Sequence, residues 1–176
     1  RILEKKRYFL IISVVGLLFL LFATRFKMLF FTLFLTSLGA ISMIYQKYFR
    51  YSHYIGFELC MMATVLTSLA YGSHVGAFVG FVSIFFGFAL SGNIKPTYFI
   101  SVLTMPLIGF IVPFFSQLNL LYLGLLMTLI YDAIILPLYI MTGSRIPTSL
   151  VFFITHMLLN YWVFSTIAPF VYFIMN

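Results

Sequence analysis

Long runs of apolar residues alternate with short polar stretches along almost the whole chain. Each run approaches the roughly 20 residues that one transmembrane helix needs. Polar residues together with Gly or Pro, which favour helix ends and helix starts, mark most boundaries between runs. No linker or low-complexity tract interrupts the series, so we expect one transmembrane domain over residues 1–176. The pattern predicts seven spans, at approximately 8–24, 28–45, 54–71, 74–91, 97–115, 119–142 and 148–174.

The first boundary decides between six and seven spans. Only Arg25-Phe26-Lys27 separates the first two runs, which predicts a very tight hairpin. The alternative is one unbroken helix over residues 8–45, which is longer than a bilayer requires. We therefore expect an all-α polytopic membrane protein, a bundle of six to seven transmembrane helices. The orientation of everything after residue 27 depends on this hairpin.

The composition agrees with a membrane protein and excludes several other classes. Apolar residues make up 64% of the chain and charged residues only 7%, whereas a soluble domain carries roughly a quarter charged residues. Too few charges remain to cover a soluble surface. Seven spans of about 20 residues leave only short loops, so the chain has no room for a nucleotide-binding domain or a large catalytic domain outside the membrane.

The net charge of +7 is better explained by a role in orienting the protein in the membrane than by nucleic-acid binding, because Lys and Arg flank the apolar runs. Cytoplasmic loops of membrane proteins carry an excess of these residues. An inside N-terminus leaves only Arg25 and Lys27 outside and predicts an outside C-terminus. We expect an integral protein of the plasma membrane with a cytoplasmic N-terminus. The inner side then holds Arg1, Lys5, Lys6, Arg7, Lys47, Arg50, Lys95 and Arg145.

Four small residues in the predicted fourth span fall on one helical face. Gly76, Gly80, Ser83 and Gly87 are spaced by four, three and four positions, which aligns them along a helix. In lipid, such a face lets a neighbouring backbone approach closely. Packing within the bundle is the favoured interpretation. The alternatives are a docking face for a partner subunit and a close approach to a ligand.

Two acids and one histidine lie deep enough in the predicted spans to suggest function. Glu58 is about one turn into the third span and Asp132 is near the middle of the sixth. An ionisable group at such depth is costly unless it is paired, protonated or hydrated. Glu58 has the nearby Arg50 and His53 as candidate structural partners. Asp132 has no basic neighbour in sequence, so structural pairing and function stay equally open.

The last span adds His156 and Asn160, four residues apart and therefore on one face. One interpretation is a polar lining for a pocket, and another is a hydrogen bond to Asp132. A purely structural interhelical hydrogen bond is the third. The single cysteine, Cys60, lies in an apolar run and is expected to be a small buried hydrophobe.

We find no catalytic constellation in the sequence. It has no Ser nucleophile with a base and an orienting group, no His-Glu-x-x-His zinc pattern, no acidic pair at metal-binding spacing and no glycine-rich phosphate loop. We therefore expect a protein that is not an enzyme, with no catalytic residues, no metal and no cofactor. A small lipid-acting membrane enzyme is the least favoured alternative.

One segment carries a family resemblance. It runs from Tyr54 to Ser83, with Gly72 at a tight turn and Gly76-Ala77-x-x-Gly80 on the following helix. It resembles the substrate-binding membrane subunits, or S components, of energy-coupling-factor vitamin transporters. The stretch His156-Met-Leu-Leu-Asn160 also resembles the polar last helix of some of these subunits. The same fold class includes the bacterial rod-shape-determining D protein, which binds a morphogenetic partner.

The resemblance implies a small-molecule ligand captured from outside, a transmembrane coupling subunit and two ATPases as partners. It implies that Gly76 and Gly80 are packing positions. Two departures weaken the match: the family typically has six helices, and its small-residue docking motif on the first helix is not clear here. The ligand-binding candidates that it implies are Glu58, Asn93, Asp132, His156 and Asn160.

The leading hypothesis is therefore a membrane subunit that binds a small molecule for uptake and is energised by separate partner subunits. The alternative is a non-enzymatic membrane scaffold or assembly subunit that holds partner proteins. A ligand pocket predicts that Asp132, His156 and Asn160 converge on a polar cavity. A scaffold predicts that these residues satisfy one another and that a small-residue or aromatic face is left exposed.

Overall fold

The computed structural model describes residues 13–17, 26–49, 52, 55–92 and 94–176. In this part of the chain all regular structure is helical and no strand occurs, so the all-α prediction is confirmed. The elements are α2 (Lys27–Ser42), η1 (Ile44–Lys47), α3 (Cys60–Tyr71), α4 (Ser73–Ser91), α5 (Tyr98–Ile111), η3 (Val112–Phe115), α6 (Leu120–Met141) and α7 (Ile146–Met175).

Five of the described helical segments are long and apolar enough to cross a membrane, and the protein is an integral membrane protein. They begin at Lys27, Ser73, Tyr98, Leu120 and Ile146. Most of the predicted first span, 8–24, lies outside the described residues. The choice between six and seven spans therefore stays a prediction.

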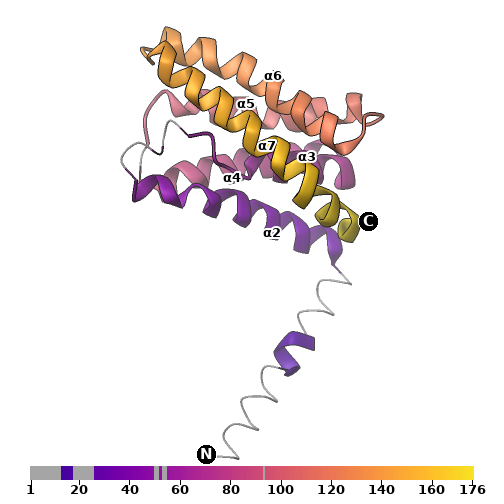
Figure 1. The fold of residues 1–176 in the computed structure, drawn as a ribbon. Coiled ribbons are helices and arrows are strands. Elements are labelled where there is room, and N and C mark those ends of the chain that lie inside the picture. The colour runs from indigo at the N-terminus through magenta and orange to yellow at the C-terminus, as the bar shows by residue number, and fades with distance from the viewer. Residues whose placement is uncertain (1–12, 18–25, 50–51, 53–54, 93) are drawn as a thin grey trace, which may run out of the picture.

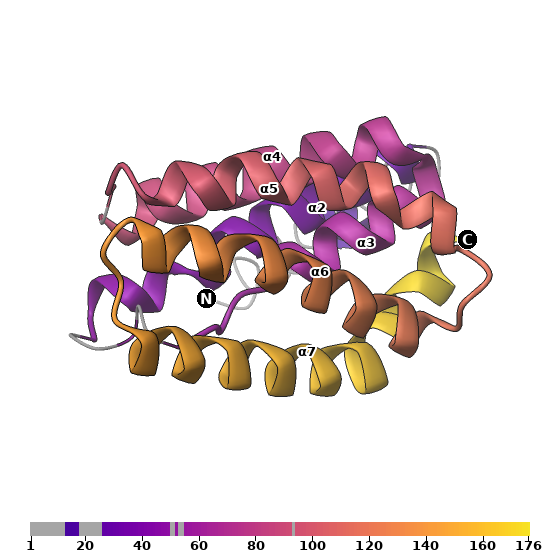
Figure 2. The same cartoon turned by 90° about the horizontal axis from the view of Figure 1, so that it is seen from above.

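The helices form a bundle in which α3 is the central element (Figures 1 and 2). α4 packs against α2, α3 and α5, while α7 packs mainly against α6 and α3. Nine of the 12 residues of α3 are buried, from Cys60 to Ser68. The other helices turn one side to α3 and leave aromatic and aliphatic side chains on the outside, as expected for helices that face lipid.

Small residues allow the central helices to approach one another closely. A Cβ added at Gly76 would lie 2.7 Å from the Cα of Ser68 in α3, and one at Gly80 would lie 2.8 Å from Thr64 Oγ1. At Gly87 an added Cβ would meet the side chain of Met43. Ser83 is fully buried. The small face of α4 is thus covered inside the bundle and is not open to a partner subunit.

The third predicted span differs from the structure at its start. We expected a helix over 54–71, but α3 begins only at Cys60. Its 12 residues cover about 18 Å at 1.5 Å per residue, well short of the roughly 30 Å hydrocarbon core. Residues 55–59 are not helical and run against α7, where Gly56 N–H donates to Thr155 Oγ1 at 2.9 Å. Non-helical backbone at membrane depth is tolerated where protein or a cavity surrounds it.

Candidate ligand-binding site

Three ionisable side chains meet at the N-terminus of α3. His156 Nδ1 lies 2.8 Å from Asp132 Oδ1, and His156 Nε2 lies 3.0 Å from Glu58 Oε1. The helices α6 and α7 supply Asp132 and His156, and the segment before α3 supplies Glu58. His156 and Asp132 are 0% exposed and Glu58 is 6% exposed. The hydrogen bond between His156 and Asp132, one of the interpretations that the sequence left open, is present. We call the three residues the buried triad.

Glu58 also caps α3. Its carboxylate accepts the backbone N–H of Cys60 and, at 3.2 and 3.3 Å, that of Met61. The first N–H groups of a helix have no partner within the helix, and they carry the positive end of its dipole. The partner of Glu58 is thus the helix N-terminus and His156. The nearby Arg50 and His53, which the sequence suggested, lie outside the described residues.

Packing fixes the orientation of the imidazole. The Tyr131 ring lies edge-on to it with centroids 5.8 Å apart, and the Phe152 ring lies 5.2 Å away. Gly56 packs against the backbone of His156, where an added Cβ would lie 2.8 Å from the His156 Cα. Only a residue without a side chain fits at this position, so Gly56 allows Glu58 to reach the ring.

The geometry sets the charge of the buried triad. Each of the two contacts of His156 joins a ring nitrogen to a carboxylate oxygen, so each needs one proton between the two atoms. These two contacts therefore hold two protons, and the net charge is −1 as long as Asp132 Oδ2, which has no hydrogen-bond partner, carries no proton of its own. Such a charge inside a bilayer is costly unless other groups compensate it. The α3 N-terminus provides part of this compensation through its dipole.

The remaining predicted site residues take different positions. Asn160 lies one turn beyond His156, is 1% exposed, and donates from Nδ2 to the His156 carbonyl at 3.0 Å. Its Oδ1 has no hydrogen-bond partner, and neither does Asp132 Oδ2. Asn93 lies outside the described residues.

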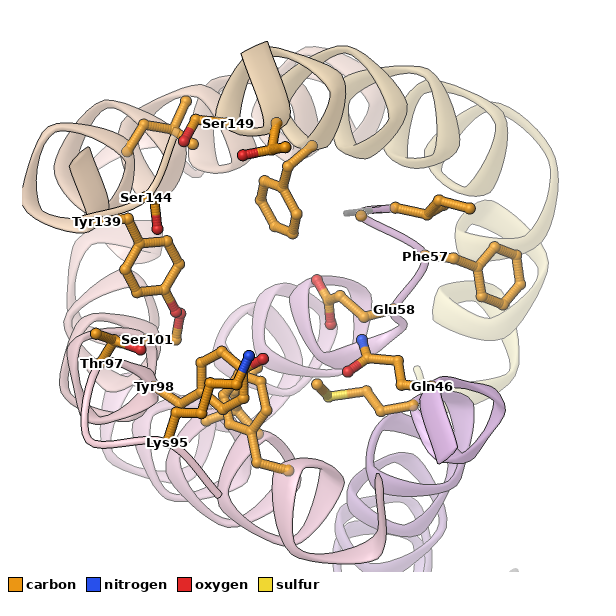
Figure 3. A pocket seen from close by; sticks show the side chains of 18 of the residues that line it. Gln46, Phe57, Glu58, Lys95, Thr97, Tyr98, Ser101, Tyr139, Ser144 and Ser149 are labelled. Atoms are coloured by element: carbon orange, nitrogen blue, oxygen red, sulfur yellow. The ribbon is translucent and has the colours of Figure 1, made fainter. Parts of the chain in front are cut away.

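A cavity of about 470 Å³ opens at the end of the bundle where α2 ends and α7 begins. Figure 3 shows it ringed by helices, with the side chains of Glu58 and Lys95 toward one side and Ser149 across from them. Of the predicted ligand-binding residues that the structure describes, only Glu58 lines it, and Asp132, His156 and Asn160 do not. Its polar lining consists of Gln46, Glu58, Lys95, Thr97, Tyr98, Ser101, Tyr131, Tyr139, Ser144, Arg145, Thr148 and Ser149.

Charge is unevenly distributed along this cavity. Glu58 is buried, whereas Lys95 and Arg145 are exposed at the loops before α5 and α7. The Lys95 ammonium lies 5.8 Å from the centre of the Tyr98 ring, a cation–π distance. On the wall, Ser101 and Tyr139 share a hydrogen bond of 2.6 Å. The cavity thus offers a carboxylate, hydroxyl groups and two cations to a small polar molecule.

Sequence reasoning missed most of this cavity lining. Ser101 and Tyr139 are single polar residues in apolar runs, 38 positions apart, and neither forms part of a recognisable motif. The available signal was the polar boundary stretches before α5 and α7, which hold Lys95 and Arg145. In the part of the chain that the structure describes, no group of three or more His, Cys, Asp or Glu is arranged to hold a metal ion.

Comparison of the chain with protein-family models, with curated proteins and with solved structures finds no match. A functional proposal for this protein therefore rests on its fold and on the geometry of the buried triad and the cavity.

Proposed function

We propose that this protein is a membrane subunit that binds a small polar molecule in the cavity above Glu58 for uptake, with energy supplied by separate partner subunits. The observation that carries the proposal is the cavity itself. Its volume of about 470 Å³ lies within the range of roughly 300–1,000 Å³ typical of ligand pockets. It combines apolar walls with a few polar groups, as ligand sites do.

The short α3 supports this proposal. In many transporters a helix that begins at membrane depth points its N-terminus at the binding site. Here α3 begins at Cys60, and the Glu58 carboxylate sits between its first N–H groups and the cavity. A ligand that donates hydrogen bonds to Glu58 would contact the α3 N-terminus through one side chain.

The distribution of basic residues supports a cavity mouth on the cytoplasmic side. Lys47, Lys95 and Arg145 lie at the mouth end of the bundle, while Lys27 begins α2 at the other end. Basic loops favour the cytoplasm. In an uptake cycle this conformation corresponds to the state that releases ligand inward. Capture from outside then requires a rearrangement, and partner subunits with ATPase activity would drive it.

A scaffold that holds partner proteins is the second candidate, and two observations favour it. The three residues of the buried triad largely satisfy one another, as a structural role requires. In addition, α4 exposes a row of aromatic side chains, Phe78, Phe81, Phe85 and Phe86. Lipid or a partner helix would cover this row equally well.

Native mass spectrometry of the protein, gently solubilised from its own host membranes, tests the proposal. The variant Tyr139→Phe removes one hydroxyl from the cavity wall and keeps the ring. Tyr122→Phe makes the same chemical change at a side chain that is 62% exposed and does not line the cavity. We expect a co-purifying small molecule with the unmodified protein and with Tyr122→Phe, and a reduced amount with Tyr139→Phe.

The partners recovered in the same experiment separate the two candidates. ATPase subunits together with the small molecule support the uptake subunit. Stoichiometric protein partners without any small molecule favour the scaffold and contradict ligand binding. A small molecule that is retained equally by both tyrosine variants and by Ser101→Ala would show that it binds elsewhere.

A further inference from the structure

Two buried oxygen atoms on facing helices lack hydrogen-bond donors. Asp132 Oδ2 in α6 and Asn160 Oδ1 in α7 have no partner, and their residues are 0% and 1% exposed. Buried polar atoms are nearly always paired, and leaving one unpaired costs about 1–3 kcal/mol. Neither residue lines a described cavity, so the cavity ligand does not reach these atoms.

The register of α6 and α7 brings a third oxygen to the same region. Asp132 bonds to His156, and two turns away a Cβ added at Gly124 would collide with the Phe164 ring. The two helices run antiparallel, so Thr128 lies at the level of Asn160, midway between these contacts. Thr128 is 0% exposed, and its hydroxyl donates to the Gly124 carbonyl at 2.8 Å. Its oxygen lone pairs stay free to accept.

A cation near Asp132 Oδ2 would balance the charge of the buried triad. With Asp132 Oδ2 unprotonated the triad carries −1, and the described basic side chains Lys27, Lys47, Lys95 and Arg145 are exposed and form no ion pair with it. The α3 N-terminus acts on Glu58, while Asp132 lies on the opposite side of the imidazole. A single positive charge beside Asp132 Oδ2 would neutralise the triad and satisfy the unpartnered oxygens.

We propose that Asp132 Oδ2, Asn160 Oδ1 and Thr128 Oγ1 bind one sodium ion at the seam between α6 and α7. A carboxylate, an amide carbonyl and a hydroxyl are hard oxygen ligands, the type that hard cations prefer. The charge of −1 matches a monovalent ion better than Mg²⁺ or Ca²⁺. A small ion is favoured over K⁺ because the site lies within a packed helix seam. The proposal does not depend on the ligand of the cavity.

The experiment measures thermal unfolding of the full chain in detergent, without added ligand, in NaCl, KCl or choline chloride at equal ionic strength and pH. We expect a saturable rise of the apparent melting temperature with Na⁺ only. Equilibrium binding of radioactive ²²Na⁺ then gives the affinity. We expect at least tenfold weaker binding in Asp132→Asn and in Thr128→Val.

Thr128→Val keeps the shape of the side chain, so it remains informative if Asp132→Asn does not fold. Thr104→Val is its matched control, because Thr104 is also buried and its hydroxyl also donates to a carbonyl one turn back, at 2.7 Å. We expect Thr104→Val to retain Na⁺ binding. Equal stability in Na⁺, K⁺ and choline would overturn the proposal. So would unchanged Na⁺ binding in Thr128→Val and Asp132→Asn, or stability that responds to pH and not to Na⁺.

Discussion

A Cβ added at Gly56 would lie 2.8 Å from the Cα of His156, so the chain before Glu58 runs directly against the backbone of α7. The two residues are 100 positions apart in the sequence, yet their close contact leaves no room for a side chain at position 56. Gly56 N–H donates to Thr155 Oγ1 one residue away, and Glu58 bonds to the imidazole of His156. This crossing holds the non-helical segment inside the bundle and places Glu58 between α3 and the cavity.

Gly56→Ala tests this crossing. Backbone atoms of His156 cannot move aside as a flexible side chain would, so the added methyl group must displace the segment or α7. Overpacking of this kind costs about 1–3 kcal/mol, sometimes more, and we expect the upper part of this range. Thermal denaturation in detergent measures the effect. Gly16→Ala is the control, because an added Cβ there has no atom within 4 Å. Equal melting of both variants would contradict the described crossing.

A second prediction concerns the buried triad. His156→Leu leaves Asp132 and Glu58 without their common partner, and removing one member of a buried ion pair typically costs about 3–5 kcal/mol. We expect the free energy of unfolding to fall by this amount, as measured by thermal or denaturant unfolding. His74→Leu, at an exposed position near the start of α4, provides the control and should change stability little.

The double variant Asp132→Asn, His156→Leu shows whether the loss comes from uncompensated charge. Once Asp132 is neutral, removal of His156 leaves only one carboxylate without a partner. We expect the combined effect to be smaller than the sum of the two single effects, by about 1–3 kcal/mol. Additive effects would mean that the two side chains do not interact in the folded protein.

Most helices and part of the triad were predictable from the sequence, and physical reasons explain what was missed. Apolar runs fixed most helices within a few residues, because span length is set by the bilayer. The start of α3 was wrong: residues 55–59 include apolar Ile55, Phe57 and Leu59 and continue the hydrophobic run. The helix begins only at Cys60 because Glu58 caps it and Gly56 contacts α7. The cap is local, but Glu is not among the residues that usually cap helix N-termini, and the contact of Gly56 with α7 joins segments about 100 positions apart.

The same distinction applies to the site. Asp132 and His156 are predictable because any isolated polar group deep in a span needs a partner. The link from His156 to Glu58 joins positions 98 residues apart, and no periodicity encodes it. The cavity is a property of how α2, α5, α6 and α7 surround the short α3, so its lining could not be derived before the fold was known.

A third prediction tests the packing of α6 on α7. A Cβ at Gly124 would penetrate the ring of Phe164, whose side chain is fully buried. Gly124→Ala should therefore destabilise the protein by about 1–3 kcal/mol. Adding Phe164→Leu makes room for the new methyl group and should recover part of the loss. If Phe164→Leu costs the same with Gly124 as with Ala at this position, the two residues are not in contact.

The last prediction concerns the side of the membrane on which the cavity opens, and the chain is well suited to test it. Its single cysteine, Cys60, is 0% exposed, so a membrane-impermeant maleimide should not label the unmodified protein in intact cells. Ser144 and Ser116 are both exposed and lie at opposite ends of α6, with Ser144 on the cavity lining. Replacing either by cysteine changes one atom.

We expect Ser116→Cys to react in intact cells and Ser144→Cys to react only after the membrane is opened. The reason is that Lys47, Lys95 and Arg145 accompany Ser144 at its end of the bundle, and basic loops stay in the cytoplasm. Labelling of both variants in detergent controls for reactivity. The reverse pattern in intact cells would place the cavity mouth outside. It would also make direct capture of ligand from the exterior possible without the rearrangement that an inward-facing mouth requires.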